Sequence, residues 1–146
     1  MNDPTIVNLG NIKAIIMHGD TLCLDDTDYL KFRSLVRSKA WISNFLKKSI
    51  GERLEIYNNL KIQSENEKKI KSDSIMDVNN TAVEDIFRKN NYPSYLIHGH
   101  THRLKTHDYL IENHFTQRWV LGDWHRTGNY ILWENNQLKS VLLNEL

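Results

Sequence analysis

Residues 95–102 read Tyr-Leu-Ile-His-Gly-His-Thr-His, a short apolar run that passes directly into three histidines. The run follows Pro93 and has the length and composition of a buried β-strand. Neutral imidazole is the commonest metal ligand among protein side chains, and glycine allows a tight turn beside an ion. In α/β folds, ligands collect at the carboxyl ends of strands. The stretch therefore predicts an α/β fold with a metal site at the end of this strand.

A second stretch has the same pattern. Residues 15–20 read Ile-Ile-Met-His-Gly-Asp, again an apolar strand that ends in His-Gly. Exposed histidine clusters also occur in solvated loops, so one such tract alone has a structural explanation. Two strands that end in this way favour a metal site between them.

The composition limits the class of protein. At 146 residues the chain is long enough for one domain with a single core. A net charge of +1 does not favour a nucleic-acid partner, and the single cysteine, Cys23, excludes an internal disulfide and is typical of a reducing compartment. No apolar run reaches the roughly 18 residues of a spanning helix, and no signal-peptide pattern opens the sequence. We expect a cytoplasmic protein that is soluble or attached to a membrane surface.

Periodicity and turn residues predict the remaining elements. The opening residues predict a hairpin, an acidic turn at residues 25–28 predicts a helix cap, and residues 80–90 are amphipathic. The expected strands are 5–9, 12–17, 95–97, 109–111, 115–121, 130–133 and 138–143, and the expected helices are 28–39, 41–62 and 80–90.

The helical segment 41–62 is unusually apolar for a surface element, and lysines and an arginine are interleaved with its apolar residues. It predicts either a pair of core helices or a lid whose apolar side receives acyl chains while its basic residues meet anionic headgroups. The next segment, 64–72, is polar and rich in lysine, which on composition alone indicates a solvated helix face or a loop.

Several motifs together carry a family resemblance. Residues 17–20 and 99–102 resemble the last two motifs of the calcineurin-like metallophosphoesterases. With residues 18–23, 25–26, 75–79 and 121–125, the chain from about Pro4 onward resembles the UDP-2,3-diacylglucosamine pyrophosphohydrolases of lipid A biosynthesis.

The resemblance implies a fold and domain organisation. It implies the carboxyl-terminal half of a four-layer α/β/β/α sandwich, with residues 40–72 as a helical lid insertion in a single domain over 1–146. The Asp-x-His, Gly-Asp and Gly-Asn-Arg-Asp motifs of the amino-terminal half have no counterpart in residues 1–10. We therefore expect that the amino-terminal half is missing from this chain.

The resemblance also implies roles for individual residues. His18 and His100 would bind one metal ion and His102 its neighbour, in a site that holds two Mn²⁺ ions when complete. His100 and His102 would be catalytic. The residues expected to contact the substrate are Asp26, Ser64, Lys68, Lys71 and His100.

The implied reaction is hydrolysis of the pyrophosphate of UDP-2,3-diacylglucosamine to UMP and 2,3-diacylglucosamine 1-phosphate (lipid X). The implied partners are this lipid substrate, the surface of the inner membrane and a separately encoded amino-terminal half. Two further hypotheses stay open: a catalytically inactive fragment, and a metal- or membrane-binding interaction module. A structural zinc finger is disfavoured because Cys23 is the only thiol.

Overall fold

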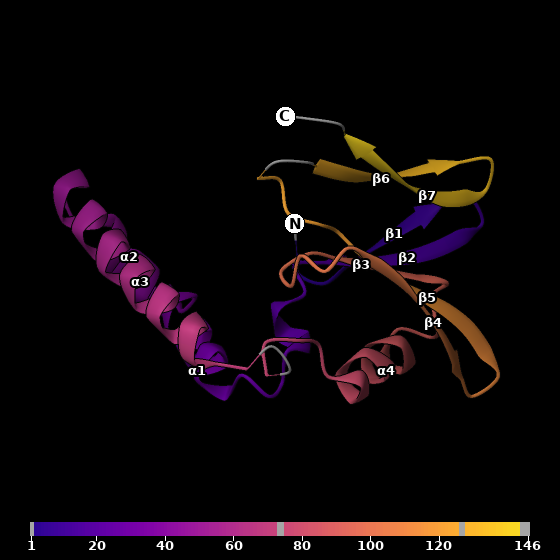
Figure 1. The fold of residues 1–146 in the computed structure, drawn as a ribbon, viewed down its shortest axis with the longest axis horizontal. Coiled ribbons are helices and arrows are strands. Elements are labelled where there is room, and N and C mark those ends of the chain that lie inside the picture. The colour runs from indigo at the N-terminus through magenta and orange to yellow at the C-terminus, as the bar shows by residue number, and fades with distance from the viewer. Residues whose placement is uncertain (1, 73–74, 126–127, 144–146) are drawn as a thin grey trace. The chain divides into compact units, whose positions relative to one another are not determined.

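The computed structural model describes residues 2–72, 75–125 and 128–143 (Figure 1). The chain divides into two compact units. The sheet unit comprises Met1–Leu22 and Val78–Leu146, and the helical unit comprises Cys23–Asp77.

The sheet unit is built on a five-stranded mixed sheet in the order β1-β2-β3-β5-β4. Strands β2 and β3 and strands β3 and β5 are parallel, whereas β1 and β4 are antiparallel to their neighbours. The strands are β1 (Thr5–Leu9), β2 (Ile12–Met17), β3 (Tyr95–His98), β4 (Lys105–Ile111) and β5 (His114–Val120). The parallel β2–β3 pair brings the carboxyl ends of both His-Gly strands to one edge of the sheet.

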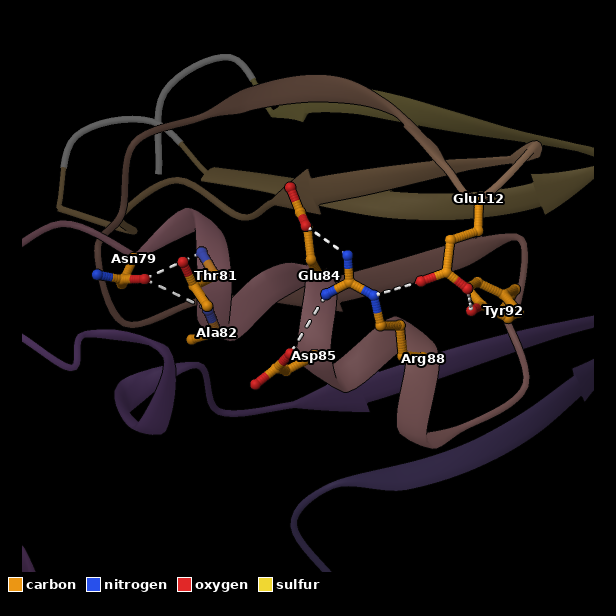
Figure 2. A network of polar contacts seen from close by, with 8 residues as sticks. All are labelled: Asn79, Thr81, Ala82, Glu84, Asp85, Arg88, Tyr92 and Glu112. Carbon is orange, nitrogen blue, oxygen red and sulfur yellow. Dashed lines mark hydrogen bonds and ion pairs between the residues drawn. The ribbon is translucent and has the colours of Figure 1, made fainter.

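Helix α4 (Asn80–Lys89) packs on one face of this sheet and forms the core with it (Figure 1). The Asn79 side chain caps the helix by accepting hydrogen bonds from the amides of Thr81 and Ala82 (Figure 2). The fully buried residues Val83 and Phe87 point from α4 into the sheet. They meet the inward residues of the strands, which are Ile15, Met17, Leu96 and Ile111.

A polar cluster ties α4 to the β4–β5 turn (Figure 2). Arg88 donates from Nε to Glu112 Oε1 at 3.0 Å and from Nη2 to Glu84 Oε2 at 2.8 Å. The Tyr92 hydroxyl donates to the other oxygen of Glu112, and the Tyr92 ring stacks on His114 with centroids 4.0 Å apart. The hydrogen bonds from Tyr92 and Arg88 lower the pKa of Glu112.

A two-stranded sheet of β6 (Gly128–Glu134) and β7 (Gln137–Leu143) belongs to the same unit. Trp133 of β6 lies edge-on to Tyr95, with ring centroids 6.2 Å apart. Tyr95 and Leu96 are successive strand residues and so point to opposite faces of the sheet. Because Leu96 belongs to the α4 core, β6–β7 lies against the face opposite to α4.

The helical unit contains α1 (Thr27–Val36), α2 (Lys39–Leu46) and α3 (Ile50–Ile70). Each begins at a side-chain cap, namely Asp26, Ser38 and Ser49, and Ser49 forms a reciprocal capping box with Glu52. Trp41 and Phe45 stack within α2 with centroids 4.9 Å apart. No residue described in α1–α3 is buried, so local interactions rather than a core define these helices.

The predicted α/β class is confirmed, and the five-stranded sheet is mixed. The hairpin 5–17 and the helix 80–90 occur nearly as expected. The segment predicted as one helix over 41–62 is two helices separated at residues 47–49, and the second continues to Ile70. Within the described part of the chain, every helix is too short or too polar to span a lipid bilayer.

Candidate functional site

The two His-Gly strand ends lie side by side. In the parallel β2–β3 pair, Met17 is in register with His98. One residue further on, the Gly99 amide donates to the His18 carbonyl at 3.1 Å, which extends the ladder beyond the strands. The rings of His18 and His100 consequently lie with centroids 5.0 Å apart and tilted by 55°. The structure thus brings together two of the three predicted metal ligands.

His18 lies beside a buried carboxylate. Its Nδ1 lies 3.2 Å from Oδ1 of Asp20, which is fully buried in the short 3₁₀ turn Asp20–Leu22. The His18 side chain itself is 46 % exposed, so its ring is accessible from outside the protein.

The loop after β3 has an unusual backbone. Both His100 and His102 have positive φ, at 64° and 53°. The Thr101 amide donates to the Gly99 carbonyl at 2.8 Å, which closes a γ-turn around His100. A γ-turn with positive φ at its centre is the rarer and more strained form. Strained non-glycine residues cluster at functional sites, where the surrounding structure enforces them.

His102 does not join the His18–His100 pair. It is exposed, and its Nδ1 lies 3.2 Å from the carbonyl of Gly122. Among the described residues no group of three or more His, Cys, Asp or Glu side chains is arranged to hold a metal ion. The donor set suits a divalent ion that prefers imidazole, but His18 and His100 supply only part of a coordination sphere.

His98 is buried behind this loop. Its Nδ1 lies 2.9 Å from the Gly99 carbonyl and its Nε2 lies 3.2 Å from Nη1 of Arg118, which is itself buried. Burial, opposed by the Gly99 carbonyl and reinforced by the charge of Arg118, lowers the pKa of His98 to about 4. His98 is therefore neutral near pH 7.

Of the five predicted substrate residues, His100 lies in the sheet unit and the other four lie in the helical unit. Lys71, at the end of α3, donates to Asp26 Oδ1 at 2.6 Å and lies 3.6 Å from Glu67 Oε2. Burial opposes the charged form of Lys71, but the hydrogen bond and charge of Asp26 outweigh it and raise the pKa of Lys71. The structure thus joins Asp26 and Lys71, and Asp26 also caps α1 by accepting from the Tyr29 amide at 3.1 Å.

The two remaining predicted substrate residues of the helical unit lie on α3. Ser64 is exposed there, seven residues before Lys71, which is about two helical turns. Lys68 lies in the helix, but its side chain lies outside the described residues. The assignments of Ser64 and Lys68 stay predictions.

The chain is similar to curated proteins named UDP-2,3-diacylglucosamine hydrolase. The protein from Aromatoleum aromaticum is 43 % identical over 132 residues, which cover 90 % of this chain and 54 % of that protein. The protein from Chromohalobacter salexigens is 42 % identical over 85 % of this chain and 50 % of its own length. The protein from Chromobacterium violaceum is 34 % identical over 98 % of this chain and 59 % of its own length.

This chain is a homologue of the UDP-2,3-diacylglucosamine hydrolases. The resemblance predicted from the sequence motifs is confirmed, and no model of a protein family matches the chain. The chain spans about half the length of the curated hydrolases it matches. The homology thus extends over both the sheet unit and the helical unit, because it covers 90 % of the chain.

Two residues near the His18–His100 pair had no role assigned from the sequence. Asp20 follows His18 by two residues, a spacing that lets a turn bring its carboxylate to the imidazole. Arg118 alternates with Thr116 and Val120 on the inward face of β5. An arginine on a buried strand face needs partners, and this was the available signal.

Proposed function

We propose that this chain forms part of a metal-dependent UDP-2,3-diacylglucosamine hydrolase. The observation that carries the proposal is the pairing of His18 and His100 at two parallel strand ends, in a chain with homologues of that name. In the reaction, the oxygen of a water molecule bonds to one phosphorus and the bridging P–O bond breaks. The products are UMP and 2,3-diacylglucosamine 1-phosphate.

In this proposal His18 and His100 would hold one Mn²⁺ ion and His102 would contribute to a second. The Nδ1 of His102 lies 3.2 Å from the Gly122 carbonyl, so Nε2 is the nitrogen that would bind the ion. Such ions, when bound, polarise a phosphoryl oxygen and activate water. The remaining ligands, including a bridging carboxylate, would come from an amino-terminal half that completes a four-layer sandwich.

Lys71 is the residue proposed to meet the diphosphate. Its ammonium is already held by Asp26 and Glu67, so it is charged and directed before any ligand arrives. A phosphate group would compete with these carboxylates for the ammonium, since lysine binds phosphate as a mobile point charge. Asp26 would then be free to accept hydrogen bonds from a sugar hydroxyl or amide.

The helical unit is proposed to act as a lid that meets the acyl chains at the inner membrane surface. Leu46, Ile50, Leu54, Tyr57 and Ile62 are each more than half exposed. Lysines 47, 48 and 61 lie on the same helices or between them and could meet anionic headgroups. A membrane-binding interaction module without catalysis would bind lipid through the same surface. Lipid binding without hydrolase activity would therefore favour that hypothesis.

Activity distinguishes the enzyme from the fragment. The 146-residue chain alone is expected to give no turnover of UDP-2,3-diacylglucosamine above a metal-only background, because two-metal catalysis needs a bridging carboxylate. Adding a separately expressed amino-terminal half from a homologous hydrolase should restore Mn²⁺-dependent release of UMP. Robust turnover by the lone chain would contradict the proposed division of the site.

Metal binding tests the site itself. Replacing His100 with alanine should weaken Mn²⁺ or Co²⁺ uptake by about tenfold or more, measured by isothermal titration and by elemental analysis after dialysis. His114→Ala is the matched control, because His114 is an exposed histidine at the start of β5. Equal uptake by the two variants would remove His100 from the site.

Lipid binding tests the lid. The double variant Leu46→Asp with Ile50→Asp should abolish flotation with phosphatidylglycerol vesicles, and added salt should weaken the binding of the unmodified chain. Leu110→Asp is the control, since Leu110 is 74 % exposed but lies in the sheet unit. Flotation unchanged in the double variant would assign these side chains to another role.

A further inference from the structure

We propose that Arg118 and His98 are positioning residues that hold the strained turn of residues 99–101, the His100 turn. The proposal rests on the proposed function only in treating His100 as a metal ligand. The geometry of the turn and its support can be tested without any metal.

The His100 turn needs support from outside itself. A single hydrogen bond from the Thr101 amide to the Gly99 carbonyl closes it, while His100 at its centre has φ 64°. A non-glycine residue with this backbone conformation is strained and persists only where neighbouring structure enforces it. The carbonyl of Gly99 is the atom on which the turn depends.

His98 supplies a second donor to that carbonyl. Arginine has only N–H donors, so Arg118 Nη1 must donate to His98 Nε2 across 3.2 Å. The His98 proton is therefore on Nδ1, which donates to the Gly99 carbonyl across 2.9 Å. Arg118 thus selects the tautomer that can hold the turn.

Both supporting side chains are themselves fixed. Arg118 also donates from Nε to the Tyr109 hydroxyl at 3.2 Å, and that hydroxyl donates to Asn80 Oδ1 at 3.4 Å. The His98 carbonyl accepts from the Leu121 amide at 2.8 Å. A chain of hydrogen bonds therefore runs from the start of α4 through the sheet to the Gly99 carbonyl.

Gly19 leaves room for the His98 ring. Its φ of 104° is in the region that favours glycine, and a Cβ there would lie 2.7 Å from His98 Nδ1. The His-Gly of the first strand end thus admits the histidine that supports the second. Both His-Gly pairs serve one arrangement, in which His18 and His100 face each other.

Two substitutions of His98 test whether its side chain positions the His100 turn or only fills space in the core. In His98→Asn the side-chain amide can replace Nδ1 as donor to Gly99 but loses the acceptor for Arg118. In His98→Gln the amide reaches the place of Nε2 and can accept from Arg118, but the donor to Gly99 is lost. A residue that only filled space would give the same result in both variants.

The experiment uses the 146-residue chain without metal. Long-range ¹H–¹⁵N spectra should show the proton of His98 on Nδ1. Hydrogen exchange of the Thr101 amide should accelerate by about tenfold in His98→Gln, because loss of one hydrogen bond to the Gly99 carbonyl corresponds to about that factor. In His98→Asn, which keeps the donor to Gly99, the exchange rate should stay within about threefold of the unmodified chain. The nuclear Overhauser contact between the His18 and His100 rings should weaken in the Gln variant alone.

Three results would overturn the proposal: a His98 proton on Nε2 in the unmodified chain, equal Thr101 exchange in the Asn and Gln variants, and Thr101 exchange in Arg118→Met as slow as in the unmodified chain. The Arg118→Met measurement keeps the test decisive if a His98 variant does not fold, because methionine removes the donor to Nε2 and leaves His98 in place. Metal uptake measured on the same variants separates the two proposals. If Thr101 amide exchange changes as expected but metal uptake does not, the His100 turn is held as proposed and His100 is not a metal ligand.

Discussion

The sheet unit and the helical unit obtain their structure from different sources. In the sheet unit a core of α4 and the strands excludes water around residues such as Phe87 and Leu96. Among the described residues of the helical unit, only Cys23 is buried. Its helices depend on caps and on the pairing of Lys71 with Asp26. Tertiary packing therefore fixes the imidazole pair, whereas helix caps and one ion pair between distant residues hold the candidate substrate residues Asp26 and Lys71.

The largest expected effect tests this contrast with two apolar truncations. Phe87→Ala removes a fully buried ring and should lower the free energy of unfolding by about 3–5 kcal/mol. Leu54→Ala removes a side chain that is 56 % exposed in α3 and should cost less than about 1 kcal/mol. Urea denaturation followed by circular dichroism measures both. Similar losses would mean that α3 has a core of its own.

Replacing a glycine with alanine should change the stability in opposite directions in the two units. Gly19→Ala places a Cβ against His98 at a positive φ and should destabilise by about 2 kcal/mol or more. Gly51→Ala lies in the first turn of α3 with open space around it, and should stabilise by about 0.5–1 kcal/mol.

Thermal unfolding of the two alanine variants beside the unmodified chain measures both changes. The variant at Gly19 should also lose the contact between the His18 and His100 rings. A neutral result at Gly19 would show that the His98 ring can move aside, and would weaken the support proposed for the His100 turn.

The sequence predicted the parts of the molecule that follow local rules. Alternation and turn residues located the hairpin at residues 5–17, and an amphipathic pattern located α4. The apolar strands ending in His-Gly predicted that His18 and His100 would meet, and a parallel β2–β3 pair brings them together. Sequence motifs also identified the homologous hydrolases.

The break between α2 and α3 was missed although it has a local signal. Residues 47–49 read Lys-Lys-Ser between apolar residues, and Ser49 starts the second helix through a capping box with Glu52. The other differences depended on contacts that no local pattern specifies. The pairing of Arg118 with His98 joins residues 20 positions apart, and the Lys71–Asp26 pair joins residues 45 apart. The left-handed backbone at His100 could not be read from a histidine, since φ there is set by the Gly99 carbonyl and its donors.

The smallest expected effect concerns two exposed carboxylates, one in each unit. Glu112 joins the β4–β5 turn to Arg88 and Tyr92 of the α4 region, while Glu52 interacts with Ser49 three residues away. Hydrogen bonds from Tyr92 and Arg88 lower the pKa of Glu112, and those from the side chain and amide of Ser49 lower the pKa of Glu52. A carboxyl group whose pKa is lower in the folded state stabilises the fold above its unfolded pKa. That contribution disappears as the pH falls through the folded pKa.

Glu112→Gln should therefore reduce the free energy of unfolding slightly at pH 7, and the difference from the unmodified chain should vanish as the pH falls below about 4.5, the ordinary pKa of glutamate. Glu52→Gln should have a weaker effect, because glutamine also completes a capping box. Urea titrations of the three proteins from about pH 7 to about pH 3 measure the differences. Only Glu112→Gln should alter the sheet unit, since Glu112 joins residues 24 positions apart and Glu52 joins neighbours. If both variants lose the same free energy of unfolding at every pH, the exposed pair of Glu112 with Arg88 adds nothing to the packing of α4. In that case only the helix caps and the buried core distinguish the two units.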